Sequence, residues 1–174
     1  MNNNNILQKI KIKQYKKPYI SKRWIKWLND KEITKFSNQR FLVHSLKTQR
    51  TYINNLRKNN TVFFKIYLEA QEIGNIFLTD IDKINKNCGI GYLIGKKLLW
   101  NKGIATFAVK FIIKYAFIKL KMKKIYTWCY SNNNGSKKVL MKNNFKIEGV
   151  IKKFYQFNHT KRVDKVYFGL YQDK

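Results

Sequence analysis

The chain has 174 residues, of which 44% are hydrophobic, and its 37 basic residues outweigh 9 acidic ones to give a net charge of +28. A chain of this length and composition can bury one core, so we expect a single domain over residues 1–174 with a frayed start at 1–8. The start is polar and then basic, and no segment is apolar enough to span a membrane. We therefore expect no export signal and no membrane partner, and predict a cytoplasmic protein.

The excess of basic residues has two interpretations. A field of this strength attracts polyanions such as nucleic acids. However, the surplus is nearly all lysine, and lysine rises together with asparagine and isoleucine, a combination typical of AT-rich coding DNA. We therefore interpret most of the charge as compositional drift and expect no specific nucleic-acid partner.

The cysteine and histidine content predicts neither a disulfide bond nor a metal site. Cys88 and Cys129 match no disulfide framework, and with His44 and His159 they lack the number and spacing of zinc ligands. We expect two free thiols and no metal site.

The first half of the chain predicts strands and two short helices. Period-two alternation in IKIKQY predicts a strand at 10–15, and Ser21 stands where it would cap a helix over 21–30. A second helix is expected after Ser45. Three strands of a meander follow at 61–70, 72–81 and 88–95, with polar turns between them.

The second half alternates helices and strands. Apolar residues from Ile104 to Ala116 repeat at helical spacing, which predicts a helix buried on one face. A strand at 123–130, a short helix at 132–144 capped by Asn133 or Asn134, and a closing pair of strands at 145–157 and 163–172 complete the chain. This order predicts an α+β or three-layer α/β fold, with a mixed, mostly antiparallel sheet of about six to seven strands and about four helices.

The turn WNKGIAT stands where a strand gives way to the buried helix. The amides and dipole of a helix start bind phosphate without a charged side chain, and Gly103 and Ala105 would let a pyrophosphate approach the backbone. Such a turn is also compatible with a helix that simply begins with glycine.

The neighbouring residues favour the phosphate site. GYLIGKKLLWNKGIATFAVKFIIKYAF resembles the acetyl-CoA-binding motif of the GNAT superfamily of N-acetyltransferases, in its ribosomal-protein-acetyltransferase-like branch. Trp100 stands in the Arg/Gln position of the consensus, Gly103 and Ala105 in its glycine positions, and Asn101 replaces a glycine usual in the branch.

A second segment carries the same resemblance. SNNNGSKKVLMKNNF is similar to a motif of that branch, with Asn133 and Ser136 matched and Asn144 in place of a helix-ending glycine. Asparagine is the next-best residue for a left-handed cap. The resemblance runs from about Tyr19 to about Gly169 and implies a GNAT fold.

The resemblance also implies a cofactor site and a reaction. Acetyl-CoA would be the co-substrate, with its pantetheine along one strand, its pyrophosphate on the following loop, and a backbone N–H near Leu93 for the thioester oxyanion. The residues concerned would be Tyr92, Leu93, Ile94, Trp100, Asn101, Lys102, Gly103, Ile104, Ala105, Thr106 and Asn133.

The general acid and base are not assigned by the resemblance. Many relatives carry a tyrosine at the position of Leu140 and a glutamate at the position of Gly89. His44, Tyr130 and Asp80 are the candidates that remain, each with packing or turn formation as its structural alternative.

The acceptor is inferred from the N-terminal half. WLNDKEITKFSNQRFLVHSLKTQRTYI looks like a segment of acetyltransferases from surface-polysaccharide and nonulosonic-acid gene sets, some of which acetylate a UDP-linked amino sugar. IGNI and KRVDKVYFGLY match further segments of that branch. The resemblance implies that Arg40, Phe41 and His44 bind an amino sugar linked to UDP or dTDP. By residue type alone, Arg40 could equally bind a backbone carbonyl.

Other acceptors and roles stay open at this point. A protein N-terminal amine or another small amine would fit the same frame, and so would a non-catalytic module that binds polyanions. The charge of +28 favours an anionic acceptor over polyamines and basic proteins. Association into a homodimer is also left open.

Overall fold

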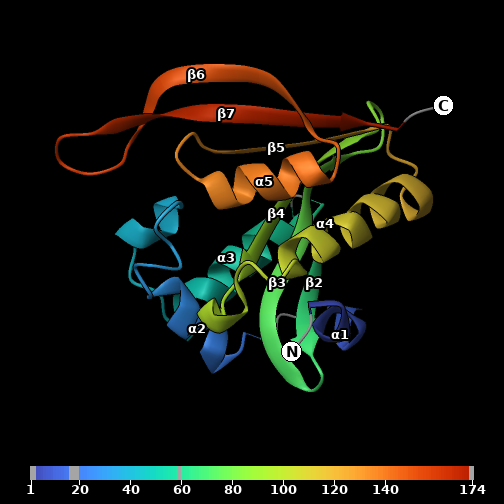
Figure 1. The fold of residues 1–174 in the computed structure, drawn as a ribbon, viewed down its shortest axis with the longest axis horizontal. Coiled ribbons are helices and arrows are strands. Elements are labelled where there is room, and N and C mark those ends of the chain that lie inside the picture. The colour runs from blue at the N-terminus through green and yellow to red at the C-terminus, as the bar shows by residue number, and fades with distance from the viewer. Residues whose placement is uncertain (1–2, 16–19, 59, 173–174) are drawn as a thin grey trace.

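A computed structural model of the chain describes residues 3–15, 20–58 and 60–172, and its centre is a seven-stranded sheet (Figure 1). The strands lie in the order β1-β2-β3-β4-β5-β7-β6, and all neighbours are antiparallel except β4 and β5. Their bounds are β1 Ile10–Gln14, β2 Val62–Leu68, β3 Gln71–Asp82, β4 Asn87–Ile94, β5 Lys124–Tyr130, β6 Lys146–Gln156 and β7 Arg162–Tyr171. The predicted mixed, mostly antiparallel sheet is confirmed.

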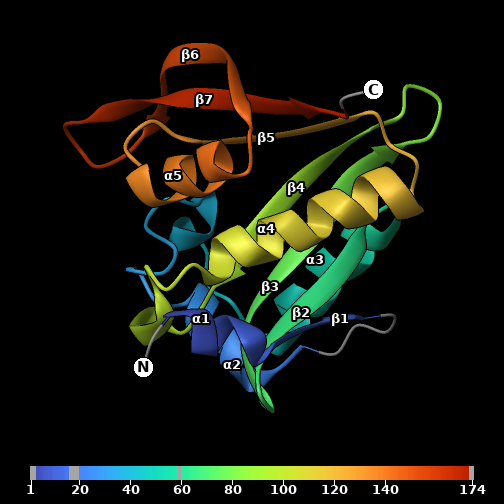
Figure 2. The same ribbon diagram turned by 45° about the vertical axis from the view of Figure 1, so that its right-hand side comes forward.

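Helices cover both faces of the sheet. In Figure 2, α4 (Ile104–Lys114) crosses in front of β3 and β4, while α3 (Leu46–Lys58) lies behind them. The short helix α2 (Lys22–Leu28) packs beside α3, and α5 (Asn134–Lys142) packs beside α4. The three-layer arrangement is therefore the predicted one.

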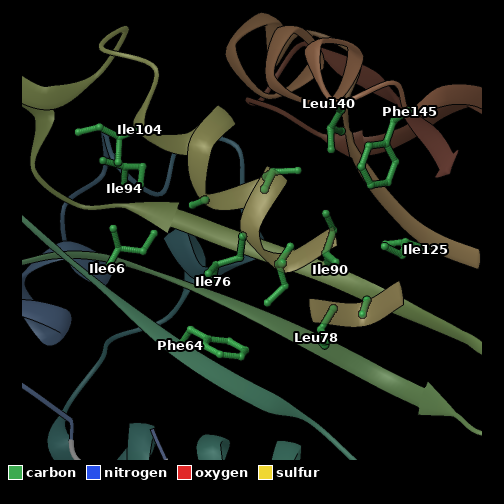
Figure 3. Packing of buried hydrophobic residues seen from close by; sticks show 14 of the residues in the cluster. Phe64, Ile66, Ile76, Leu78, Ile90, Ile94, Ile104, Ile125, Leu140 and Phe145 are labelled. Atoms are coloured by element: carbon green, nitrogen blue, oxygen red, sulfur yellow. The ribbon is translucent and has the colours of Figure 1, made fainter. Parts of the chain in front are cut away.

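The main core lies between the sheet and α4. Figure 3 shows Phe64, Ile66, Ile76 and Leu78 of the sheet near side chains of α4 and α5, all of them buried. A second cluster on the other face joins Trp24 and Leu28 of α2 to Ile53 of α3 and Phe63 of β2. Each layer of helices thus buries its own apolar stripe against one face of the sheet.

Local signals in the sequence form the caps that were predicted. The Ser21 hydroxyl accepts from the Trp24 amide at 3.1 Å, and the Asn133 side chain accepts from the Ser136 amide at 3.0 Å. Asn144 follows α5 with φ +65, the left-handed conformation expected for a residue in place of a glycine.

The N-terminus differs from the prediction. Residues 3–8 form the helix α1 (Asn3–Gln8) rather than a frayed end, because Ile6 packs into the main core and Leu7 packs beside it. Residues 1–2 lie outside the described part. Cys88 and Cys129 are free and buried, as predicted. Within the described residues, no helix is long and apolar enough to cross a membrane.

Candidate active site

β4 and β5 form a fork. They pair only from Asn87–Gly89 to Lys124–Tyr126, and just beyond this ladder the Thr127 hydroxyl donates to the Ile90 carbonyl at 2.9 Å. From that point the strands separate toward their C-terminal ends, as Figure 2 shows. Within the described ranges, the part of the β4 edge beyond Gly89 therefore has no neighbouring strand.

The register of β4 decides which of its backbone groups line the fork. The Gly95 amide donates to the Ile73 carbonyl of β3 at 2.9 Å. In an antiparallel ladder, residues that bond to a given neighbour alternate, so Gly91 and Leu93 also turn their N–H and C=O groups toward β3. Leu93 therefore cannot offer its N–H to a thioester in the fork, and the neighbouring residue Tyr92 is the one whose N–H faces it.

Tyr92 presents its backbone to the open part of the fork. The alternate residues Ile90 and Ile94 turn the same way, and their carbonyls accept from Thr127 Oγ1 and from the Trp100 indole at 2.8 Å. Between these two bonds lie the N–H and C=O of Tyr92. Such an edge can pair with amides laid along β4, and its N–H can stabilise an oxyanion.

The start of α4 fits a phosphate. Gly103 caps the helix with φ +82, and no side chain bonds the cap. A Cβ built on Gly103 would have only Leu7 Cδ1 nearby, at 3.8 Å, so the space in front of the helix is open. The amides of Ile104, Ala105 and Thr106 in the first turn have no partner inside the helix. These groups have the geometry that the predicted anion site requires, so the site stays a prediction.

The loop before α4 is fixed to the strand that precedes it. Trp100 bonds the Ile94 carbonyl through its indole, which places the loop at the tip of β4. Asn101 has φ +61, and asparagine tolerates this conformation better than most residues, which explains how it replaces the usual glycine. Lys102 is half-buried beside the helix start.

A pair of hydroxyls joins β4, one arm of the fork, to α5. Tyr92 Oη lies 2.8 Å from Ser136 Oγ of α5, and burial raises the pKa of Tyr92, so its hydroxyl stays protonated. Asn133 positions this serine, because its side chain bonds the Ser136 amide. The sequence matched Ser136 to a motif but predicted no role for it.

His44 is held inside the protein. It is 4% exposed, its Nε2 lies 2.8 Å from the Gln39 carbonyl, and its Nδ1 lies 2.9 Å from Gln49 Nε2. The amide of Gln49 in turn accepts from the Trp24 indole, which orients the amide and makes His44 Nδ1 an acceptor. Both ring nitrogens have partners, so the structure favours a packing role over the predicted catalytic and acceptor-binding roles.

Arg40 is also bound by the fold. Its guanidinium donates to the Lys35 carbonyl and to the Gln156 carbonyl, both at 2.7 Å, and lies over the rings of Phe41 and Tyr130 at 4.4 and 5.2 Å. Phe41 itself is 64% exposed. The structure thus favours the structural alternative for Arg40, which joins the loop before α3 to the β6–β7 hairpin.

Tyr130 lies in the same joint. Its side chain is fully buried, its hydroxyl donates to Asn38 Oδ1 at 2.6 Å, and its ring stacks on Tyr155 at 4.0 Å. Burial raises the pKa of Tyr130. A buried hydroxyl with a fixed acceptor is poorly placed to exchange protons with a substrate, so the structure favours a packing role for Tyr130, in the stack with Tyr155, over the predicted catalytic role.

Asp80 is the candidate that remains accessible. It is exposed, with φ +49, at the point where the β3–β4 register shifts between Thr79 and Asp82. Burial raises the pKa of Tyr126, and the charge of Asp80 adds to the effect. Thr79 pairs with Gly89, three residues before Tyr92, or about 10 Å along the strand.

Sequence reasoning missed the outer face of β5. Ile125 and Cys129 pack into the core beside α4, so Tyr126, Trp128 and Tyr130 point to the opposite face. The alternation in KIYTWCY was the available signal. No group of three or more histidine, cysteine or acidic side chains placed to hold a metal occurs in the described ranges.

A parallel pair of strands that separates beside a helix start without a side-chain cap matches the acetyl-CoA site that the sequence resemblance implies. A family model described as "Acetyltransferase (GNAT) domain" matches residues 20–146, and the chain belongs to this family. It is an acetyl-CoA-dependent N-acetyltransferase of the GNAT type.

Three known proteins illustrate how similar this chain is to other acetyltransferases. Acetyltransferase PseH of Campylobacter jejuni is 26% identical over 131 residues, which are 75% of this chain and 79% of PseH. The structure of spermidine N-acetyltransferase from Vibrio cholerae with CoA and spermine has a TM-score of 0.81 at 17% identity, covering 95% and 96% of the two chains. RimL, a ribosomal L7/L12 α-N-protein acetyltransferase solved with coenzyme A, gives 0.81 at 14% identity and the same coverage.

Proposed function

We propose that the protein transfers acetyl from acetyl-CoA to the amino group of a nucleotide-linked amino sugar in the cytoplasm. The fork of β4 and β5 carries the first half of this proposal, because it joins a free backbone edge at Tyr92 to an open helix start at Gly103. The similarity to PseH, together with the sequence segments around Arg40, supports the acceptor. The net charge of +28 suits an anionic acceptor.

Residues of β4 and of the loop that follows it hold acetyl-CoA in this proposal. The loop from Trp100 to Thr106 binds the pyrophosphate through the first amides of α4, and the Tyr92 backbone pairs with the pantetheine. Acetyl-CoA supplies the acetyl group as a thioester. The Tyr92 amide faces the fork and is placed to stabilise negative charge on the carbonyl oxygen.

Two groups move protons. An amine attacks only when neutral, and we propose that Asp80, the exposed carboxylate among the candidates, accepts its proton through a chain of waters, because its position in the register lies about 10 Å or more along β4 from Tyr92. The pair of Tyr92 and Ser136 is placed to donate a proton to the departing sulfur, since Tyr92 stays protonated and Ser136 is oriented by the α5 cap. A thiol pKa of about 8.5 makes this assistance modest.

The other acceptors are a protein N-terminal amine, the substrate class in RimL's name, and a polyamine, the class in the name of the Vibrio cholerae enzyme. A polyamine is a polycation, and a chain with a net charge of +28 would repel it. The protein N-terminal amine is placed second because the segments around Arg40 support a nucleotide-linked acceptor.

A panel of acceptors tests the proposal, with release of the CoA thiol as the readout. We expect release with a UDP-linked 4-amino sugar and little with spermidine or with a peptide that has a free N-terminus. The Tyr92→Phe variant should lower turnover with the sugar, while Tyr115→Phe, which removes a hydroxyl far from the fork, should not. Release with the peptide but not with the sugar would refute the nucleotide-sugar acceptor. Release with none of them would refute the proposal that the protein acetylates these amines.

A further inference from the structure

The ammonium of Lys165 on β7 lies among three aromatic rings. Its Nζ is 4.6 Å from the centre of the Tyr167 ring, 4.7 Å from that of Trp128 and 5.0 Å from that of Phe154. Cation–π attraction from three sides holds a flexible side chain in one place. We call these four residues the Lys165 box.

The Lys165 box borders the fork on the face opposite α4. Trp128 follows Thr127, whose hydroxyl closes the fork, and it points away from the α4 side. Lys165 pairs with Tyr130 and Tyr167 pairs with Trp128, and residues paired across antiparallel strands share a face. An amine that reaches the fork from the side opposite α4 and α5 therefore passes the box.

The box is positive and partly open. Lys165 is half-buried, and no ion pair joins it to a carboxylate within residues 3–15, 20–58 and 60–172. Its neighbour Asp164 lies on the other face of β7, where it bonds Lys152 and the Lys153 amide. Trp128 is 41% exposed, which leaves indole surface for a planar ligand.

Two side chains of β7 hold Phe154 of β6, one of the three rings of the Lys165 box, in position. Arg162 donates to the carbonyls of Lys153 and Phe154 at 2.7 and 3.0 Å, and Asp164 accepts from the Lys153 amide at 2.8 Å. These bonds fix an irregularity in β6 between Ile151 and Tyr155, where Lys153 has φ +51. Phe154 is thereby held against Lys165. Arg162 and Asp164, both in the segment KRVDKVYFGLY, thus hold the irregular part of β6 in place.

We propose that the Lys165 box binds the nucleoside diphosphate part of the acceptor, with the ammonium on a phosphate and the Trp128 indole against the base. The inference rests on the proposed function and names the feature of the acceptor that this face recognises. Lysine binds phosphate as a point charge, and indoles stack on bases of any sequence. The rings orient the ammonium in advance, so little side-chain entropy is lost on binding.

Binding of UDP, measured by calorimetry on protein saturated with CoA, tests the box without requiring turnover. Saturation with CoA keeps UDP away from the phosphate site at α4. Lys165→Gln should weaken UDP about tenfold or more, as expected for the loss of one charged hydrogen bond. Lys165→Arg should keep most of the affinity, because it retains the cation and the contact with the rings.

Lys123→Gln is the matched control. It removes the same charge from the rim of a basic cavity of about 310 Å³ that is also lined by Lys86 and Lys121, at the far end of β4 and β5. UDP should bind this variant as it binds the unmodified protein. Trp128→Leu should weaken UDP but leave inorganic pyrophosphate nearly unchanged.

Three results would overturn the Lys165 box: equal UDP affinity in Lys165→Gln, equal losses in Lys165→Gln and Lys123→Gln, or no binding of UDP to the CoA-saturated protein. The last result leaves acetyl transfer itself standing if thiol is still released with an amine that carries no nucleotide. If Lys165→Gln weakens UDP as expected but the unmodified protein releases no thiol with any amine, the Lys165 box stands and the proposed acetyl transfer is refuted.

Discussion

Replacing Gly103 by alanine should damage stability and acetyl-CoA binding by separate routes. The residue has φ +82, so a side chain there is strained by about 1–2 kcal/mol although the space around it is open. For a domain of this size, that strain lowers the melting temperature of the free protein by about 2–8 °C. The added methyl group also enters the space in front of the first amides of α4, where the pyrophosphate would approach.

Thermal melts with and without acetyl-CoA separate the two effects. At about 100 times its Kd, a ligand stabilises the native state by about 2.7 kcal/mol, which raises the melting temperature by about 5–11 °C. The unmodified protein should show this rise and Gly103→Ala should lose most of it. Asn60→Gly is the control, because it relieves the left-handed strain at φ +52 in the turn before β2, outside the loop from Trp100 to Thr106, and should keep the full rise.

Two outcomes would refute the reasoning about Gly103. If Gly103→Ala melts lower but keeps the whole rise with acetyl-CoA, then the phosphates bind elsewhere. If its free form melts as the unmodified protein does, then the left-handed conformation of the helix cap is wrong.

The remaining predictions concern protons, the acceptor loop and the thiols. Ser136→Ala should lower kcat by a larger factor than it changes the KM for acetyl-CoA, and an unchanged kcat would show that Ser136 takes no part in proton transfer. Arg40→Lys should raise the KM for the acceptor and lower the melting temperature together, because lysine cannot bond the Lys35 and Gln156 carbonyls at once; a raised KM at an unchanged melting temperature would point instead to direct contact with substrate. Burial raises the pKa of Tyr92, so the native state keeps a proton that the unfolded state releases, and the free energy of unfolding should fall above about pH 10; denaturant titrations that show no such fall would contradict it. Burial also raises the pKa of Cys88 to about 12 and of Cys129 to about 11, so both thiols should react with a disulfide reagent only after unfolding, and rapid reaction of the native protein at pH 8 would be the contrary result.

Local patterns in the sequence predicted most of the fold. Ser21, Asn133 and Asn144 act through neighbours within a few residues, so their positions could be identified from the sequence itself. Strand alternation and the apolar repeat after Gly103 likewise express burial on one face. The short helix α1 was missed because six residues carry too little periodicity, and only contact with the core makes it form.

The site was predictable only where chemistry resides in the backbone. The turn at Gly103 was found because glycine marks an unusual backbone conformation, and the structure gives it φ +82. Arg40 was assigned to the acceptor from the resemblance of its segment, and its carbonyl partner at Gln156 could not be identified from the sequence because it lies 116 residues away. The two partners of the His44 ring, from Gln39 and Gln49, also depend on how a loop folds back onto α3. Residue type cannot distinguish such bonds from contacts with a ligand.

The direction of the β4 backbone was beyond any pattern in the sequence. Whether Tyr92 or Leu93 faces the fork depends on one register, set by the bond from Gly95 to Ile73. A shift of one residue would exchange all of these groups between β3 and the fork. This register therefore decides which backbone groups face the fork.

A crystal structure of the protein with CoA is the most direct test of the central claim. We predict that the Tyr92 N–H and C=O bond the pantetheine and that the pyrophosphate lies on the amides at Gly103 to Ala105, between the separated ends of β4 and β5. Pantetheine bonded to the Leu93 backbone, or CoA outside the fork, would contradict the account.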